Sequence, residues 1–288
     1  MFSVVITAFN RAWCIERAIE SVLRQSEPDF EVVVSDDGST DGTADLIAQK
    51  YVALSGQVRC VRSDANKGMF HAQMLGVQSS MGQYIVFLDS DDELLPDALR
   101  NFSKHIHRAV GVDAFFQTLV DDDGSVKGQF PSLLAGQDQR IFNYGDMCRL
   151  FAIGDYLPCV QTEVMRRSDY FAPVSDVSAY THNLWYNLFV VADVLYTRDV
   201  GGVVHLGHAD RRTKNQASRA GIWLKGVEYF LYHHGSAIRR HGGQLRKCYM
   251  DASRFAFQSG QRGKALAYFI RAVLLEAEFR LVGHRKFM

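Results

Sequence analysis

The sequence lacks the long apolar run that a membrane-spanning helix requires. No apolar stretch of the 288-residue chain approaches the roughly 20 residues that cross a bilayer, so we expect a protein that is not integral to a membrane. The opening residues, MFSVVITAFN, have no basic stretch before their short apolar run. This pattern is typical of a strand rather than of a signal peptide, and we therefore expect the protein in the cytoplasm.

Paired cysteines and glycine-rich phosphate loops are also missing. The five cysteines are scattered without CxxC spacing, which argues against a zinc site or a disulfide framework and favours reduced thiols. No GxGxxG motif follows the first apolar run, and GxxxxGK followed by Ser or Thr does not occur. The sequence therefore argues against a dinucleotide-dependent enzyme and a P-loop NTPase.

Charge is balanced over the whole chain but not along it. Residues 210–288 hold 16 Lys and Arg against 5 Asp and Glu, a net charge of +11. Residues 1–209 hold 16 Lys and Arg against 27 Asp and Glu, a net charge of −11. Such a split predicts two parts that meet different partners, with a boundary between residues 209 and 210.

Apolar periodicity divides the first hundred residues into alternating strands and helices. Short, continuously apolar runs are typical of strands buried on both faces, and the segments between them carry apolar residues at helical spacing. The expected strands are residues 2–9, 30–37, 57–63 and 83–90, and the expected helices are residues 12–25, 41–51 and 69–80. This alternation implies right-handed crossovers and an α/β fold, with a mainly parallel sheet and helices on both faces.

Beyond residue 96 the pattern is less regular. We expect helices over residues 97–109, 142–153 and 180–192, a strand and hairpin tip over residues 113–128, and one or two strands over residues 194–207. From about residue 215 the chain is expected to be helical. An apolar stripe between Leu266 and Leu281 makes its last helix amphipathic.

Three aspartates follow the fourth expected strand. The segment FLDSDD ends an apolar run with Asp89, Asp91 and Asp92. The carboxyl ends of parallel strands meet at one edge of a sheet, where ligands bind. Carboxylate oxygens at this density suit a hard divalent cation, Mg²⁺ or Mn²⁺, that bridges substrate phosphates. A helix N-cap is the alternative role, although one aspartate is enough for a cap.

These motifs resemble those of the family 2 glycosyltransferases with the GT-A fold. The resemblance is carried by SVVITAFN, DDGSTDGT, NKG and LDSDD, which occur in the family's order and spacing within residues 2–100. It implies a GT-A catalytic domain over residues 1–209, with a nucleotide-binding half (1–100) and an acceptor half (101–209), before a basic helical extension (210–288). It also implies a nucleoside-diphosphate sugar donor, a saccharide or lipid-linked acceptor, inversion at the anomeric carbon, and work in bacterial cell-surface polysaccharide synthesis.

The resemblance also implies roles for single residues. Those implied for the base, the ribose and the loop beside the nucleotide are Thr7, Phe9, Asn10, Asp36, Asp37, Lys67 and Gly68. Those implied for the metal are Asp89, Asp91, Asp92 and His208. The guanidinium groups of Arg211 and Arg212 are candidates to hold the diphosphate on chemical grounds. Asp89 is expected to touch the ribose as well, and His205 offers a second nitrogen ligand. A solvated basic loop is the alternative for the stretch that holds His205 to Arg212.

The general base departs from the family pattern. The family has an acidic pair four or five residues before a Trp, whereas Tyr180 and Thr181 stand there before Trp185. Asp176 is the nearest upstream carboxylate, and His182 titrates near neutrality, so these two are the candidate catalytic residues. Two alternatives stay open, namely a nucleotide-sugar-binding protein with a degenerate base and a sugar nucleotidyltransferase. The second normally shows a loop rich in Gly and Arg after the first strand, which TAFNRAW lacks.

The helical extension combines the apolar stripe with Lys and Arg. Either the stripe packs on the catalytic domain or on a second subunit in a homodimer, or it docks peripherally at the inner face of an anionic membrane, where lipid-linked acceptors lie. Nucleic acid is not expected as a partner, because the basic residues are not interleaved with an aromatic platform.

Overall fold

The computed structural model describes most of the N-terminal part of the chain and its last two long helices. The described residues are 1–53, 56–108, 112–121, 123–127, 138–143, 146, 163–166, 193–205, 220–221, 224–225, 227–228, 231–232, 235–236 and 245–284. The expected helices over residues 142–153 and 180–192 therefore lie almost wholly outside the described residues.

In the described part of the chain, ten strands form one sheet in the order β3–β2–β1–β4–β9–β6–β10–β5, with β7 paired to β6 and β8 to β10. The strands are β1 (Phe2–Ala8), β2 (Phe30–Asp36), β3 (Val58–Arg62), β4 (Tyr84–Asp89), β5 (Glu93–Leu94), β6 (Val112–Asp121), β7 (Val126–Lys127), β8 (Gln139–Phe142), β9 (Glu163–Arg166) and β10 (Asp193–Val204). The helices are α1 (Ile15–Leu23), α2 (Thr43–Ile47), the π-helix η1 (Ala48–Val52), α4 (Met69–Ser79), α5 (Ala98–Arg108), α9 (Leu245–Gln258) and α10 (Arg262–His284).

The first four long strands pair in parallel and confirm the predicted α/β alternation. β1 lies between β2 and β4, and β3 pairs with the outer side of β2. The continuous apolar runs are buried because both faces of this sheet are covered. The register sets Thr7 beside Ser35 on one side and Asp89 on the other, so the carboxyl ends of these strands share one edge.

The second half of the sheet is mixed. β9 runs antiparallel between β4 and β6, whereas β10 runs parallel to β6. The expected strand and hairpin tip over residues 113–128 are β6 and β7, which pair in antiparallel fashion, and the strand expected over residues 194–207 is the single strand β10. The two-residue strand β5 was not foreseen, and it pairs with Gly202 and Val203 of β10.

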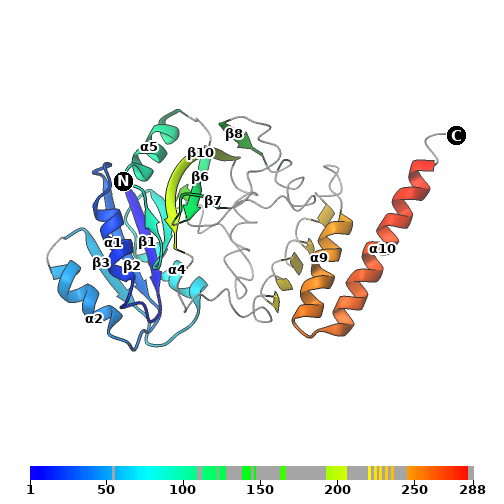
Figure 1. The fold of residues 1–288 in the computed structure, drawn as a ribbon, viewed down its shortest axis with the longest axis horizontal. Coiled ribbons are helices and arrows are strands. Elements are labelled where there is room, and N and C mark those ends of the chain that lie inside the picture. Colours follow the sequence, from blue (N-terminus) through cyan, green and yellow to red (C-terminus); the bar gives the residue numbers. More distant parts are fainter. Residues whose placement is uncertain are drawn as a thin grey trace.

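Helices cover both faces of the sheet (Figure 1). On one face, α1, the α2–η1 segment and α5 bury Ile19, Ile47 and Phe102 against the β1, β2 and β4 side chains of that face. On the other face, α4 packs closely against β1. A Cβ at Gly76 of α4 would lie only 2.3 Å from Val5 Cγ1 of β1. The predicted GT-A-like arrangement, with helices on both faces, is therefore confirmed.

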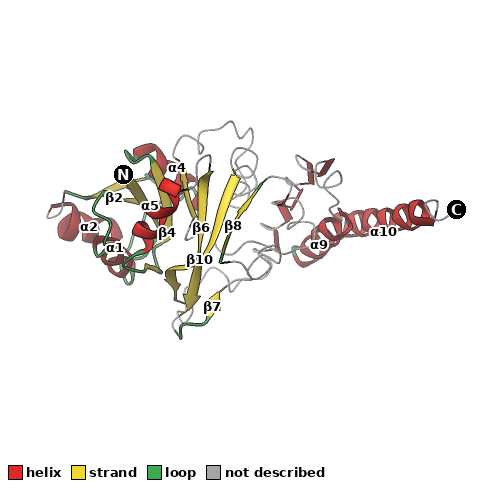
Figure 2. Ribbon diagram, turned by 90° about the horizontal axis from the view of Figure 1, so that it is seen from above, coloured by secondary structure: helices red, strands yellow, loops and turns green. Residues whose placement is uncertain are grey.

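The C-terminal helices α9 and α10 form a separate apolar cluster with short helical pieces around Leu224 and Val227. The two helices lie side by side, and α10 runs along the end of the molecule opposite the N-terminal strands (Figures 1 and 2). The helical extension predicted from about residue 215 is present in the described residues. Among the described residues, no helix is both long enough and apolar enough to cross a bilayer.

Candidate functional site

The acidic residues expected at the metal site come together at the end of β4. Asp89 closes the strand, and the backbone N–H of Asp92 donates to the carbonyl oxygen of Asp89 at 3.1 Å, which turns the chain back on itself. One ligand oxygen each from Asp89, Asp91 and Asp92 lies within 4.8 Å of the others. Three negative charges at this separation repel one another, and a divalent cation would offset that repulsion.

Two neighbouring segments hold this acidic turn. Arg17 of α1 donates through Nη2 to the carbonyl oxygen of Asp91 at 2.6 Å. The backbone N–H of His205 donates to Asp92 Oδ1 at 2.9 Å, and the His205 ring nitrogen Nε2 lies 2.9 Å from Glu93 Oε1. Glu93 also lies 3.5 Å from Arg17 Nε. The turn is therefore braced by α1 on one side and by the end of β10 on the other.

The pairing of β5 with β10 explains why His205 lies there. Asp92 and His205 are 113 residues apart in the sequence. Because Glu93 and Leu94 pair with Val203 and Gly202, the chain leaves β10 directly beside the acidic turn. The next residues of the predicted site, His208, Arg211 and Arg212, lie outside the described residues, as do Asp176 and His182.

Asp36, at the end of β2, is fully buried and bonded by the chain itself. Its carboxylate accepts hydrogen bonds from the hydroxyl and the backbone N–H of Ser39. Arg62 Nε of β3 lies 3.2 Å from Asp36 Oδ2, and Arg62 Nη2 donates to the carbonyl oxygen of Ser39 at 2.6 Å. These contacts fix the loop that follows β2.

Asp37 joins the loop after β2 to the NKG segment. Its Oδ1 accepts from the N–H of Lys67 at 3.0 Å, and its Oδ2 accepts from the N–H of Gly68 at 2.7 Å. The two loops meet closely at Gly38, which has a φ of +76° and where a Cβ would lie 2.7 Å from the carbonyl carbon of Ala65. A side chain at position 38 would therefore meet backbone and not a mobile group.

Asn10 joins the loop after β1 to the same region. It has a left-handed φ of +55°, its N–H donates to Ser39 Oγ at 2.8 Å, and its Oδ1 accepts from the N–H of Thr40 at 2.9 Å. Thr7 and Phe9, just before it, are half-buried. The structure thus brings Thr7, the Asp37 loop and the acidic turn to one edge of the sheet.

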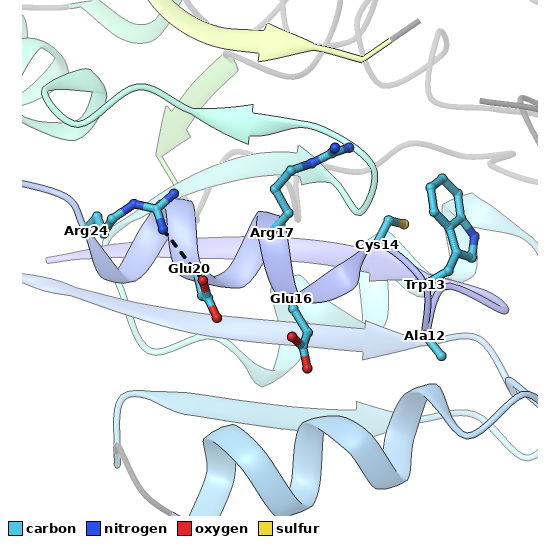
Figure 3. A pocket seen from close by; sticks show the side chains of 7 residues that line it. All are labelled: Ala12, Trp13, Cys14, Glu16, Arg17, Glu20 and Arg24. Atoms are coloured by element: carbon cyan, nitrogen blue, oxygen red, sulfur yellow. Dashed lines mark ion pairs between the residues drawn. The ribbon is translucent and has the colours of Figure 1, made fainter. Parts of the chain in front are cut away.

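A hollow of about 440 Å³ opens beside the start of α1. Trp13, Cys14 and Arg17 project to one side of α1 here, and Glu16 projects to the other (Figure 3). Burial, with a further contribution from Asp91, raises the pKa of the Cys14 thiol to about 12. Cys14 therefore stays protonated near neutral pH and acts as an apolar group under the hollow.

Sequence reasoning did not assign roles to Arg17, Ser39, Arg62 or Glu93. Glu93 carried a visible signal, because it continues the acidic run. Arg17 and Arg62 carried none, since their partners come from distant segments.

Comparison with known proteins places the chain among glycosyltransferases. The model of the family described as "Glycosyl transferase family 2" matches residues 3–157. The chain is 36% identical over 167 residues to the succinoglycan biosynthesis protein ExoO of Rhizobium meliloti, covering 58% of this chain and 43% of that one. It is 27% identical over 139 residues to the GalNAc(5)-diNAcBac-PP-undecaprenol beta-1,3-glucosyltransferase of Campylobacter jejuni, covering 48% of this chain and 45% of that one. These matches span somewhat less than half of each relative.

A solved structure shares the fold over nearly the whole chain. It is that of the mannosyltransferase PcManGT from Pyrobaculum calidifontis in complex with GDP-Man and Mn²⁺, and the TM-score is 0.60 at 16% sequence identity. The likeness covers 98% of this chain and 79% of PcManGT. Since the family match extends over more than half of the chain and includes the strands that carry the acidic turn, the chain belongs to glycosyl transferase family 2.

Proposed function

We propose that the protein transfers a sugar from a nucleoside-diphosphate sugar to an acceptor hydroxyl with inversion, in the synthesis of a bacterial cell-surface polysaccharide or glycoconjugate. The observation that carries the proposal is the group of three carboxylates at the carboxyl end of β4. It lies at the sheet edge where ligands bind in open α/β sheets. Family membership and the polysaccharide role named for ExoO support it.

Asp89, Asp91 and Asp92 would hold Mg²⁺ or Mn²⁺. The donor atoms are oxygens alone, which suits a hard cation, and the GDP-Man complex of PcManGT contains Mn²⁺. When bound, such a cation offsets the negative charge of a departing diphosphate. The chain's own part is to hold the carboxylates in place through Arg17 and the backbone N–H of His205.

The nucleotide is proposed to lie against Thr7, Phe9 and Asn10, with the Lys67–Gly68 loop at its border. Of the two aspartates after β2, Asp37 suits the base contact better. Each Asp37 oxygen accepts one backbone N–H, and a carboxylate oxygen has two acceptor sites. Asp36 already accepts from Ser39 and pairs with Arg62, so we assign it to holding the loop.

The diphosphate side is proposed to involve His208, Arg211 and Arg212. His208 follows His205 by three residues, and three extended residues span at most about 10 Å. Since His205 bonds to Asp92, this chain length permits the proposed role of His208 at the cation. Guanidinium groups a few residues further on match the geometry of phosphate oxygens.

The proton of the acceptor hydroxyl must pass to a general base as the hydroxyl attacks the anomeric carbon. Asp176 and His182 remain the proposed candidates for this role. The proposed division of labour places this chemistry in residues 1–209 and leaves the basic extension, residues 210–288, outside it. A lipid-linked acceptor is the favoured class, because the Campylobacter relative is named for an undecaprenol-linked one.

A donor screen tests the proposal. Uridine- and guanosine-diphosphate sugars are added with Mn²⁺, with Mg²⁺ or with chelator, and the melting temperature is recorded, because a ligand that binds only the folded state raises it. The expected result is stabilisation that needs both cation and nucleotide. Release of nucleoside diphosphate and the anomeric configuration of the product then report turnover and inversion. Stabilisation without turnover on any acceptor would instead identify a nucleotide-sugar-binding protein, and pyrophosphate formed from a nucleoside triphosphate and a sugar phosphate would identify a nucleotidyltransferase.

A further inference from the structure

Helix α10 packs one face against α9 and exposes large apolar side chains elsewhere. The cluster between the two helices contains Ala252 and Ala256 of α9 and Ala265 of α10, with Phe255 and Tyr268 packed against them. Five other large apolar residues of α10 lie outside this cluster and are exposed.

These large residues form one continuous surface, which we call the outer stripe. It consists of Leu266, Phe269, Ile270, Val273 and Leu274, whose side chains are 47% to 60% exposed. Their spacing of three and four residues puts them on a single helix face. A contiguous exposed apolar surface of this kind marks an interaction site.

The segment that contains the outer stripe has a surplus of positive charge. Residues 245–288 contain nine Lys and Arg against three Asp and Glu, a net charge of +6. Arg262 and Arg271 of α10 are exposed, whereas Lys264 is paired with Glu228 at 2.8 Å. The partner of the stripe must therefore accept apolar side chains next to a surplus of cations.

A second copy of the chain fits this requirement poorly. Two helix pairs of net charge +6 repel each other, and a standard dimer interface buries about 800 Å² on each partner, more than five half-exposed side chains supply. An anionic lipid surface fits better, because it attracts the cations and needs only a narrow apolar face to enter the headgroup layer.

We propose that the outer stripe docks α10 in the plane of an anionic phospholipid surface. The five apolar side chains enter the boundary between headgroups and acyl chains, and Arg262 and Arg271 approach the lipid phosphates. The docking itself is independent of the catalytic site. Its use rests on the proposed function, since it would hold the transferase at the surface where a lipid-linked acceptor lies.

Vesicle sedimentation tests the proposal without donor or metal. The full chain is mixed with phosphatidylcholine vesicles that either contain or lack phosphatidylglycerol. We expect binding to the anionic vesicles that weakens as salt is added, because screening shortens the reach of the charges. The double variant Phe269→Gln, Ile270→Gln should lower the partition coefficient at least tenfold, roughly the loss expected for two apolar side chains. Arg271→Gln should lower it roughly fivefold.

Met81→Gln is the matched control, because Met81 is also an exposed apolar residue, 65% exposed, but lies before β4. It should bind vesicles like the unchanged protein. Equal binding by the Phe269, Ile270 double variant would overturn the proposal. So would an unchanged protein that ignores anionic vesicles and forms a dimer that the double variant dissociates, measured by light scattering. Nucleotide binding, measured without vesicles, should be the same in all variants, so failure of the donor screen is a separate result.

Discussion

The two ends of the parallel sheet both carry buried acid, but they treat it differently. At the amino end, Glu31 of β2 accepts hydrogen bonds from Ser3 Oγ, from the N–H groups of Met81 and Gly82, and from Arg59 Nη2 at 2.6 Å. Burial alone would raise the pKa of the Glu31 carboxyl, but these donors outweigh it and lower the pKa below the ordinary value. One charge therefore meets several donors from three segments of the chain.

At the carboxyl end, three carboxylates are gathered, because ligand oxygens of Asp89, Asp91 and Asp92 lie within 4.8 Å of one another. Asp36 and Asp37 lie between these extremes, since their hydrogen bonds fasten loops. Buried acid is therefore structural where the chain supplies matching donors, and it indicates a ligand where several like charges are gathered.

Asp91→Asn should separate function from fold most sharply. Removing one cation ligand is expected to lower kcat/KM for sugar transfer by about a thousandfold, comparable to the loss of a main electrostatic group in other enzymes. The melting temperature without metal should stay the same or rise, because a like charge has left the group. Asp97→Asn removes an exposed charge nearby and serves as the control for both measurements. A stability loss without metal would assign Asp91 a structural role.

Glu31→Ala should show the opposite profile. Leaving the partners of a buried carboxylate unpaired costs about 3 kcal/mol in the free energy of unfolding, measured with urea at pH 7. Because the folded pKa is lowered, Glu31 contributes stability above its unfolded pKa, near 4.5, and that contribution disappears as pH falls through the folded pKa. The variant should therefore lose less stability than the unchanged protein on acidification. Glu16→Ala, in the exposed pair with Lys50, should change stability by less than about 1 kcal/mol.

Gly38→Ala should damage the junction between the loops after β2 and β3. The variant combines a left-handed φ with a Cβ only 2.7 Å from backbone, so we expect a loss of about 2 kcal/mol and weaker nucleotide binding. Gly42→Ala is matched in backbone, with a φ of +87°, but its Cβ would meet nothing within 4 Å. Calorimetry on both variants separates the effect of the close contact with Ala65 from the effect of the left-handed backbone. Equal losses would show that backbone conformation, and not the contact with Ala65, sets the effect.

Arg17→Gln should have the smallest effect of the four. Arg17 contacts the acidic turn through the carbonyl oxygen of Asp91 and through Glu93, so it positions the ligands without binding the cation. Partners of this kind typically change metal affinity by about tenfold, and kcat at saturating Mn²⁺ should be nearly retained. Arg24→Gln, which removes a more exposed arginine that also pairs with Glu93, is the control. An equal loss in the two variants would point to Glu93, rather than to the Asp91 carbonyl, as the important contact.

The local part of the structure was predictable from the sequence. The run around Val4 and Ile6 is apolar on both faces, and it became the central strand β1 because such a run is stable only between two covering layers. The acidic turn was visible because Asp89, Asp91 and Asp92 are adjacent in sequence. The proposed roles of these residues, and of Thr7, Phe9 and Asn10, stay predictions.

The long-range part was not predictable. Two residues, Glu93 and Leu94, are too few to give a strand pattern, and their partner strand lies more than a hundred residues away. The different surroundings of Asp36 and Asp37 could not be read from the pair either, because they depend on Arg62 of β3 and on the Lys67 loop. Contacts of this kind leave no periodic trace in the chain.

The bond from the His205 N–H to Asp92 has a thermodynamic consequence. It couples the conformation of the end of β10 to that of the aspartate turn. A cation that orders the turn also protects that amide from solvent exchange. By linkage, a change that stabilises the end of β10 must raise the affinity for the cation by the same factor by which the cation stabilises the end of β10. Amide exchange at residue 205 is thus a readout of an event at a turn 113 residues away in the sequence.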